Sequence, residues 1–325
     1  MTTFVTGASG HIGGNLVRAL LAEGRKVRVL VRDDTRAIDG LDVEQVRGDI
    51  LQPAALAAAT KGSEVVYHLA GHISVAGDPG GLMHRTNTEG TRNVVAACLD
   101  AGVRRLVHFS SIHALSGNPV DEVVDENKPL AESGDIIAYD RTKALGEREI
   151  IEGVDKGLDA VTVNPGAVLG PHDYKPSPMG KVVLDLCRRK MPALIDGGFG
   201  WVDVRDVVQG ALAAEKKGRI GERYLLTGHW LSTAALGDLV EEVSGVKRPR
   251  FVSPMWLAMV GAPFVTAASR LTGKRPLYTL ESLKVLRNHR HVSHQKATDE
   301  LDFSPRPTLE TIADTYEWFK QVGIL

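Results

Sequence analysis

Short apolar runs rich in β-branched residues alternate with longer helical stretches through the first half of the chain. This alternation is typical of βαβ units, in which a buried parallel sheet carries helices on its faces. We therefore expect an α/β fold built on a doubly wound parallel sheet. The expected strands are residues 3–6, 26–31, 43–47, 65–69, 105–110 and 160–164, and the expected helices are about 11–23, 53–59, 88–101 and 138–153.

The second half of the chain has a different sequence pattern. Beyond Pro165, turn-rich stretches at 170–178 and 196–200 separate strand candidates at 201–204 and 223–226 from helical patterns near 206–215 and 233–244. We predict a first domain over residues 1–165. A smaller, mostly helical lobe follows over 166–325, with segments at about 200–227 returning to the main sheet.

Charge and cysteine content exclude several classes of protein. Lys and Arg number 39 and Asp and Glu number 40, a net charge of −1, so no broad basic face for nucleic acid is expected. The two cysteines, Cys98 and Cys187, cannot build a disulfide framework or a zinc module. The chain runs from Met1 directly into a strand without a targeting segment, and we expect it to be cytoplasmic.

The longest apolar stretch covers residues 255–268 and is interrupted by Gly261 and Pro263. It is shorter than the ~20 residues that span a bilayer. We expect no membrane span and interpret this stretch as a helix packed on protein.

Three glycines follow the first expected strand and open the first expected helix. In this setting glycines permit a tight turn and bring backbone N–H groups against a pyrophosphate, while the helix N-terminus supplies partial positive charge. The sequence thus predicts a dinucleotide cofactor. The residues expected to contact its phosphates are Gly7, Ser9, Gly10, His11, Ile12 and Gly13.

Arg32 stands at the end of the second expected strand. An acidic residue there would accept a hydrogen bond from the ribose of NAD, whereas an arginine pairs with the 2′-phosphate of NADP. We favour NADP because of Arg32 and because Arg36 could provide a second positive charge. NAD stays the alternative, because Asp33 and Asp34 follow directly and either could turn inward.

Asp49 and Ile50 follow the third expected strand, where a carboxylate can accept from an adenine amino group. The alternative for Asp49 is an N-cap for the helix that begins at Pro53. Both residues are included among the expected cofactor contacts.

Tyr139 and Lys143 stand four positions apart at the start of a predicted helix, so their side chains share one face. An ammonium ~4–5 Å from a phenol lowers the pKa of that phenol by ~2–3 units at an effective dielectric constant of ~20. Tyr139 would then act as a general acid. Ser111, at the carboxyl end of a central strand, faces the same crevice and can donate to a substrate carbonyl.

These motifs occur in an order that resembles the extended short-chain dehydrogenase/reductase family, within the NAD-dependent epimerase/dehydratase superfamily. The motifs are TGxxGxxG at 6–13, His68-Leu69-Ala70, Asn87-x-x-Gly90-Thr91-x-Asn93, Ser111, Tyr139-x-x-x-Lys143 and Asn164-Pro165-Gly166. Two later segments, 198–207 and 221–226, make the chain most similar to the dihydroflavonol-reductase-like and 3β-hydroxysteroid-dehydrogenase-like members.

The resemblance implies a Rossmann fold with Tyr139 as acid/base. Lys143 would lower the pKa of Tyr139 and bond the nicotinamide ribose, and Ser111 would polarise the carbonyl. The resemblance also implies a homodimer formed through the helices 88–101 and 138–153. The further cofactor contacts that it implies are Leu69, Ala70, Gly71, Asn87, Pro165 and Val168.

The chain also departs from the family pattern. Ser116 stands where many relatives have a tyrosine, and Ile112-His113 lacks the carboxyls of the dehydratases, which disfavours sugar dehydration. Asn164 replaces the arginine usual in nucleotide-sugar epimerases. His113 is either a second acid/base or, as we prefer, a loop histidine without a role. The segment 288–294 contains histidines but no Asp or Glu, and no metal site is expected there.

The leading hypothesis is an NADP-dependent oxidoreductase that moves hydride between nicotinamide and a ketone or secondary alcohol of a small to mid-sized apolar substrate. Apolar helices of the second lobe, including 255–264, are expected to cover this substrate. One alternative is an NAD-dependent nucleotide-sugar epimerase. Another is a cofactor-binding sensor without turnover.

Overall fold

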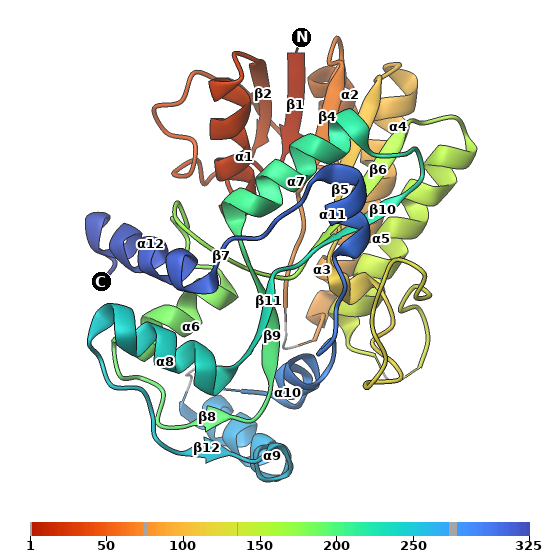
Figure 1. Ribbon diagram of the computed structural model, residues 1–325. Helices are drawn as coiled ribbons and strands as arrows, with labels where there is room; N and C mark the ends of the chain where they lie inside the picture. Colours follow the sequence, from red (N-terminus) through yellow and green to blue (C-terminus); the bar gives the residue numbers. More distant parts are fainter. Residues whose placement is uncertain (1, 75–76, 135, 273–277) are drawn as a thin grey trace.

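The computed structural model describes residues 2–74, 77–134, 136–272 and 278–325 (Figure 1). Seven strands form one sheet in the order β10-β6-β5-β4-β1-β2-β3, and every neighbouring pair is parallel. The expected parallel sheet is confirmed. Its strands are β1 (Thr2–Thr6), β2 (Lys26–Val31), β3 (Glu44–Arg47), β4 (Val65–His68), β5 (Arg105–Phe109), β6 (Ala160–Pro165) and β10 (Arg223–Leu226).

Helices cover both faces of this sheet because its strands alternate side chains between two apolar cores. Val5 belongs to the core under α1 (His11–Ala22) and α7 (Val204–Lys217). Its neighbour Phe4 belongs to the core under the helices of the opposite face. Those helices are α2 (Pro53–Thr60), α4 (Gly90–Asp100) and α5 (Ala138–Asp155).

The strand order reverses between β1 and β4. The chain moves outward through β2 and β3 on one side and through β5 and β6 on the other. Ligands of open α/β sheets bind outside the carboxyl ends of the strands at such a reversal. A ligand-binding site is therefore expected at the carboxyl ends of β1, β4 and β5.

A buried ion cluster ties the amino-terminal side of the sheet to α7. Glu215 is 4% exposed, and its carboxylate accepts hydrogen bonds from Arg25 at 2.6 Å, Tyr67 at 2.7 Å and Arg104 at 3.1 Å. These partners come from the α1–β2 turn, β4 and the α4–β5 turn. One carboxylate thus connects three segments that are distant in sequence.

Most of the remaining elements form a second region below the sheet in Figure 1. Strand β9 (Gly198–Asp203) pairs with β7 (Ala167–Leu169) and β11 (His229–Ser232). The expected strand at 201–204 therefore lies in this three-stranded sheet, whereas the one at 223–226 joins the main sheet as β10. A two-stranded pair, β8 (Leu194–Ile195) with β12 (Val252–Ser253), lies in the same region as α6 (Pro178–Cys187), α8 (Thr233–Ser244), α9 (Met255–Thr272), α10 (Leu280–Arg287) and α12 (Thr308–Gln321). Helix α11 (Gln295–Leu301) instead packs on α7 and β10 of the main sheet.

Helix α9 contains much of the long apolar stretch. It buries Ala258 and Ala262 in a small core with Leu283 of α10. Its outer face is apolar and exposed, with Trp256 66% and Phe264 73% accessible. Within the described part of the chain, no helix combines the length and apolar character needed to cross a bilayer.

Candidate active site

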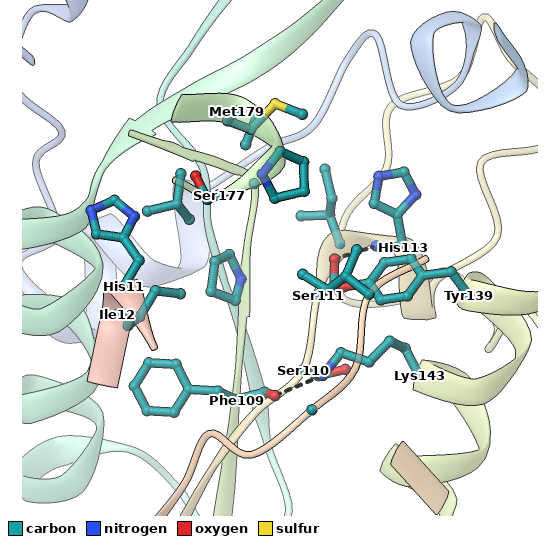
Figure 2. A pocket seen from close by; sticks show the side chains of 18 of the residues that line it. His11, Ile12, Phe109, Ser110, Ser111, His113, Tyr139, Lys143, Ser177 and Met179 are labelled. Atoms are coloured by element: carbon teal, nitrogen blue, oxygen red, sulfur yellow. Dashed lines mark hydrogen bonds between the residues drawn. The ribbon is translucent and has the colours of Figure 1, made fainter. Parts of the chain in front are cut away.

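A cavity of about 350 Å³ opens at the carboxyl ends of β1, β4, β5 and β6 (Figure 2). The main sheet supplies one wall through the turn after β1 and the residues that follow β4 and β5. The second region supplies the other wall through the start of α6, β9 and the end of α10. Those residues are Ser177, Pro178, Met179, Phe199, Gly200, Val285, Asn288 and His289.

The turn between β1 and α1 forms a tight cradle at one end of this cavity. Gly7 has a φ of 74°, and a Cβ there would lie 2.6 Å from the backbone nitrogen of Ala70. A Cβ on Gly13 would lie 2.2 Å from the carbonyl oxygen of Gly7. Gly10 caps α1 without a side-chain hydrogen bond, and the first turn holds no acidic residue. The free helix N-terminus therefore fits the pyrophosphate of a dinucleotide.

Most of the predicted cofactor contacts line this cavity. They are Gly7, Gly10, His11, Ile12, Gly13, Leu69, Gly71, Asn87, Tyr139, Lys143, Pro165 and Val168. Ser9, Arg32, Asp49, Ile50 and Ala70 are not among its lining residues. Ile50 is 5% exposed and packs in the core under α2 and α4, close enough that a Cβ on Gly90 would clash with its Cδ1 at 2.4 Å.

Asp49 does not cap α2. Its carboxylate accepts the backbone N–H of Leu51 at 2.9 Å, and Gln52 occupies the N-cap position. The N-cap interpretation of Asp49 is therefore wrong, because α2 begins at Pro53 and the carboxylate of Asp49 is bonded within the preceding turn. The other carboxylate oxygen lies 3.5 Å from Arg32.

Arg32 stands on the rim after β2 with its side chain 74% exposed. The neighbouring charges, Arg36 and Asp34, pair with each other at 2.7 Å. The guanidinium of Arg36 lowers the pKa of Asp34 to about 2. Within the part of the chain that the structure describes, the Arg32 side chain is held by its long contact with Asp49, and it can turn toward a ligand.

Asn87 fixes the chain that follows β4. Its amide accepts the N–H of His72 at 2.8 Å and donates to the carbonyl of His72 at 2.9 Å. It also donates to the Thr142 hydroxyl of α5 at 3.1 Å. This side chain therefore holds one wall of the cavity against the helix that carries Tyr139 and Lys143.

Ser111, Tyr139 and Lys143 meet in the cavity as predicted from their spacing (Figure 2). Tyr139 is buried, and this burial, with a smaller contribution from Asp140, raises its pKa to about 12 although a hydrogen bond with Ser111 acts in the other direction. The backbone of Ser111 is held by Asn164, which is fully buried and donates to the Ser111 carbonyl at 2.9 Å.

Lys143 does not lower the pKa of Tyr139, contrary to the prediction from the sequence. Its Nζ donates to the backbone carbonyl of Phe109 at 3.0 Å, and burial lowers the pKa of Lys143 to about 8. The expectation of a lowered Tyr139 pKa is wrong for this structure. Removal of the phenolate from water outweighs any benefit from the ammonium, which is directed to the strand end.

The sequence analysis missed the surroundings of His113. Its Nδ1 lies 3.3 Å from Asp140 Oδ1, and its ring lies 5.9 Å from the ring of Tyr139. The ring of His289 stands against it at 4.7 Å. The sequence signals for this cluster were the position of His113 two residues after Ser111 and that of Asp140 directly after Tyr139, whereas His289 is distant in the chain and only the fold brings it here.

The described side chains of α9 are absent from the cavity lining. We expected residues 255–264 to cover the substrate, and this expectation is wrong. Helix α10 stands between α9 and the cavity, contributing Val285 to the lining and Leu283 to the core with α9. The described residues also hold no group of three or more metal-ligating side chains placed around one point.

Comparisons with known proteins agree with this geometry. A family model described as the NAD dependent epimerase/dehydratase family matches residues 3–226. The chain is 36% identical over 329 residues to "Sterol demethylase protein B" of Methylococcus capsulatus, with 100% of each chain covered. It is 32% identical over 326 residues to "Putative dihydroflavonol 4-reductase" of Synechocystis, with 98% of this chain and 95% of the relative covered.

A solved structure named gox2253 shares the fold over almost the entire chain. It superposes with a TM-score of 0.87 at 34% sequence identity, covering 99% of this chain and 98% of the other. With a dinucleotide cradle and a serine, a tyrosine and a lysine at the same cavity, the chain belongs to the NAD-dependent epimerase/dehydratase family of extended short-chain dehydrogenases/reductases, and it is an NAD(P)-dependent enzyme.

Proposed function

We propose that the protein interconverts a ketone and a secondary alcohol on an apolar, steroid-like or terpenoid-like substrate, with NADP(H) as the hydride carrier. One observation carries this proposal: Ser111 and Tyr139 line the same cavity as the glycine cradle, and the rest of its wall is largely apolar. The apolar part of that wall includes Ile73, Ile112, Met179, Phe199 and Val285.

The charges of the cavity favour an apolar substrate over a nucleotide sugar. Among the described lining residues, Lys143 is the only lysine or arginine, and its Nζ already donates to the Phe109 carbonyl. A diphosphate in the substrate half would require several donors with permanent positive charge. An apolar ring system requires only shape and burial.

The roles of the side chains follow from their positions. The Ser111 hydroxyl is placed to donate to the substrate oxygen, and Tyr139 is placed to give that oxygen its proton. Because the pKa of Tyr139 is raised to about 12, the phenol stays protonated at neutral pH and is ready to donate during ketone reduction. The bound cofactor would supply the hydride to the carbonyl carbon, or accept it in the reverse direction.

Two further observations support the finer parts of the proposal. The relative from Methylococcus capsulatus carries a name that refers to sterols and is similar over the full chain, which supports a steroid-like substrate. The rim position of Arg32, weakly tied to Asp49, supports recognition of the 2′-phosphate of NADP.

The test is an assay of the purified protein with NADPH and NADH against cyclohexanone, a 3-keto steroid and UDP-glucose. We expect the protein to consume NADPH when the steroid is present. The loss of nicotinamide absorbance measures this consumption. Epimerisation of UDP-glucose by a protein that retains NAD would overturn the proposal in favour of an epimerase. Tight cofactor binding without turnover of any member of a broad carbonyl panel would instead indicate a sensor.

A further inference from the structure

We propose that His113, supported by Asp140, binds a second oxygen acceptor of the substrate, a carboxylate or a carbonyl placed one or two bonds from the reacting carbon. This inference rests on the proposed function and narrows its substrate class to alcohols or ketones that carry such a neighbouring group. His113 would then be a specificity-determining residue, and Asp140 a positioning residue.

The location of His113 connects it to the reacting centre. Its backbone N–H donates to Ser111 Oγ at 3.3 Å, and its ring meets that of Tyr139 at an interplanar angle of 60°. All three residues line the same cavity, and Figure 2 shows their side chains around it. A group that touches His113 is therefore close to an oxygen held by Ser111 and Tyr139.

The environment of the imidazole selects which ring nitrogen faces the substrate. Nδ1 of His113 is buried beside Asp140 Oδ1, and neither atom has a hydrogen-bond partner. Asp140 is 6% exposed, and its carboxylate occupies the side of the imidazole on which Nδ1 lies. Nε2 is therefore the nitrogen left for a group in the cavity, and an Nε2–H donates to an acceptor there.

His289 keeps this imidazole in place without adding charge. Its ring packs against His113 at an interplanar angle of 66°, and its Nε2 lies 3.1 Å from the carbonyl oxygen of Leu115. Burial lowers the pKa of His289 to about 4, so it is neutral at physiological pH. Gly117 makes room for it, since a Cβ there would lie 3.1 Å from the His289 ring.

The polarity of the cavity indicates an acceptor on the ligand. No described lining residue is Asp or Glu, whereas four are histidines and one is a lysine. Asp140 lies behind His113 and is not part of the lining. A substrate group that accepts hydrogen bonds is therefore compatible with this wall, and a cationic group has no partner on it.

The experiment compares three alcohols that share one ring: cyclohexanol, 2-hydroxycyclohexanone and 2-hydroxycyclohexanecarboxylate. In His113→Phe we expect kcat/KM to fall by ~10- to 100-fold for the two substrates that carry an acceptor, because a charged or polar hydrogen bond is lost. The kcat/KM of His113→Phe for cyclohexanol should stay within about twofold of the wild-type value. His113→Gln, which keeps an N–H donor, should recover part of the loss.

Controls separate recognition from structure. His72→Phe changes another histidine of the same cavity and should leave the ratio between substrates unchanged. Asp140→Asn should weaken the preference for both acceptor-bearing substrates by a smaller factor than His113→Phe, since it changes the carboxylate beside Nδ1 but leaves the imidazole. An equal loss for all three alcohols in His113→Phe would overturn the inference and assign His113 a structural role.

A binding measurement distinguishes this inference from the proposed function. Calorimetry with unreactive cyclohexanecarboxylate and with cyclohexanone needs no turnover. Binding of cyclohexanecarboxylate that weakens in His113→Phe supports the inference even if no alcohol is oxidised, and cyclohexanone, which has no second acceptor, is the control whose affinity should not change. Equal affinity for cyclohexanecarboxylate in the wild-type protein and the variant overturns the inference, whereas turnover of cyclohexanol alone would leave only the proposed function standing.

Discussion

Nζ of Lys143 donates a hydrogen bond to the backbone carbonyl of Phe109 at 3.0 Å, which anchors the start of α5 to the end of β5. The same burial that positions this ammonium disfavours its charge and lowers the pKa of Lys143 to about 8 from 10.5. The burial of this ammonium therefore costs folding stability.

Lys143→Met should stabilise the protein at pH 7. The unfolded chain binds a proton at Lys143 more readily than the folded one between pH 8 and 10.5, so this burial costs most below pH 8 and the cost fades as the pH rises. After loss of the Phe109 hydrogen bond is subtracted, we expect a gain of ~1–2 kcal/mol at pH 7. Urea unfolding at pH 7 and pH 10 measures it. A difference between the two proteins that does not change with pH would contradict the argument.

Tyr139→Phe should lower turnover by ~10²- to 10⁴-fold because the proton donor is lost. Cofactor affinity should stay nearly constant, since the cradle at Gly7 and Gly13 is untouched. Steady-state kinetics and cofactor titration measure the two effects. Tyr316→Phe, on α12 and outside the cavity lining, is the matched control and should be fully active. An active Tyr139→Phe enzyme would remove this residue from the chemistry.

Arg32→Ala should weaken the binding of NADPH by ~10-fold or more, as expected for loss of a charge-assisted contact with phosphate. The binding of NADH should change little. Fluorescence titration with both cofactors measures the ratio. Arg36→Ala is the control of equal charge, and a smaller effect is expected because Asp34 already pairs with Arg36. Equal losses for both cofactors in Arg32→Ala would mean that the 2′-phosphate is bound elsewhere.

Glu215→Ala should destabilise the fold by ~3–5 kcal/mol because it removes the buried carboxylate that pairs with Arg25 and accepts the hydrogen bond of the buried Tyr67 hydroxyl, leaving Arg25 paired with Glu23. Arg25 has a side chain only 10% exposed and donates to Glu215 at 2.6 Å. Glu317→Ala removes an exposed carboxylate that pairs with Lys320 and should change stability by less than ~0.5 kcal/mol. Chemical unfolding measures the free energy of unfolding of both variants. Similar decreases in the two variants would contradict a stabilising role of the buried cluster.

Several features of this protein are encoded locally and were predicted from the sequence. The first strand was predicted at residues 3–6, and in the structure its Phe4 and Val5 face two different cores because neighbouring residues of a strand point to opposite faces. Gly7 and Gly13 mark the cradle because no side chain fits at their positions. Tyr139 and Lys143 share one face of α5 because helical geometry brings positions four apart together.

The tertiary structure alone decided how these groups behave. Burial reversed the predicted pKa shift of Tyr139, and desolvation depends on the whole surroundings of a side chain rather than on its sequence neighbours. Packing also placed α10 rather than α9 at the cavity and brought His289 against His113. The sequence determined the sheet, the cradle and the reactive side chains through short-range periodicity, whereas long-range packing decided their charges and neighbours.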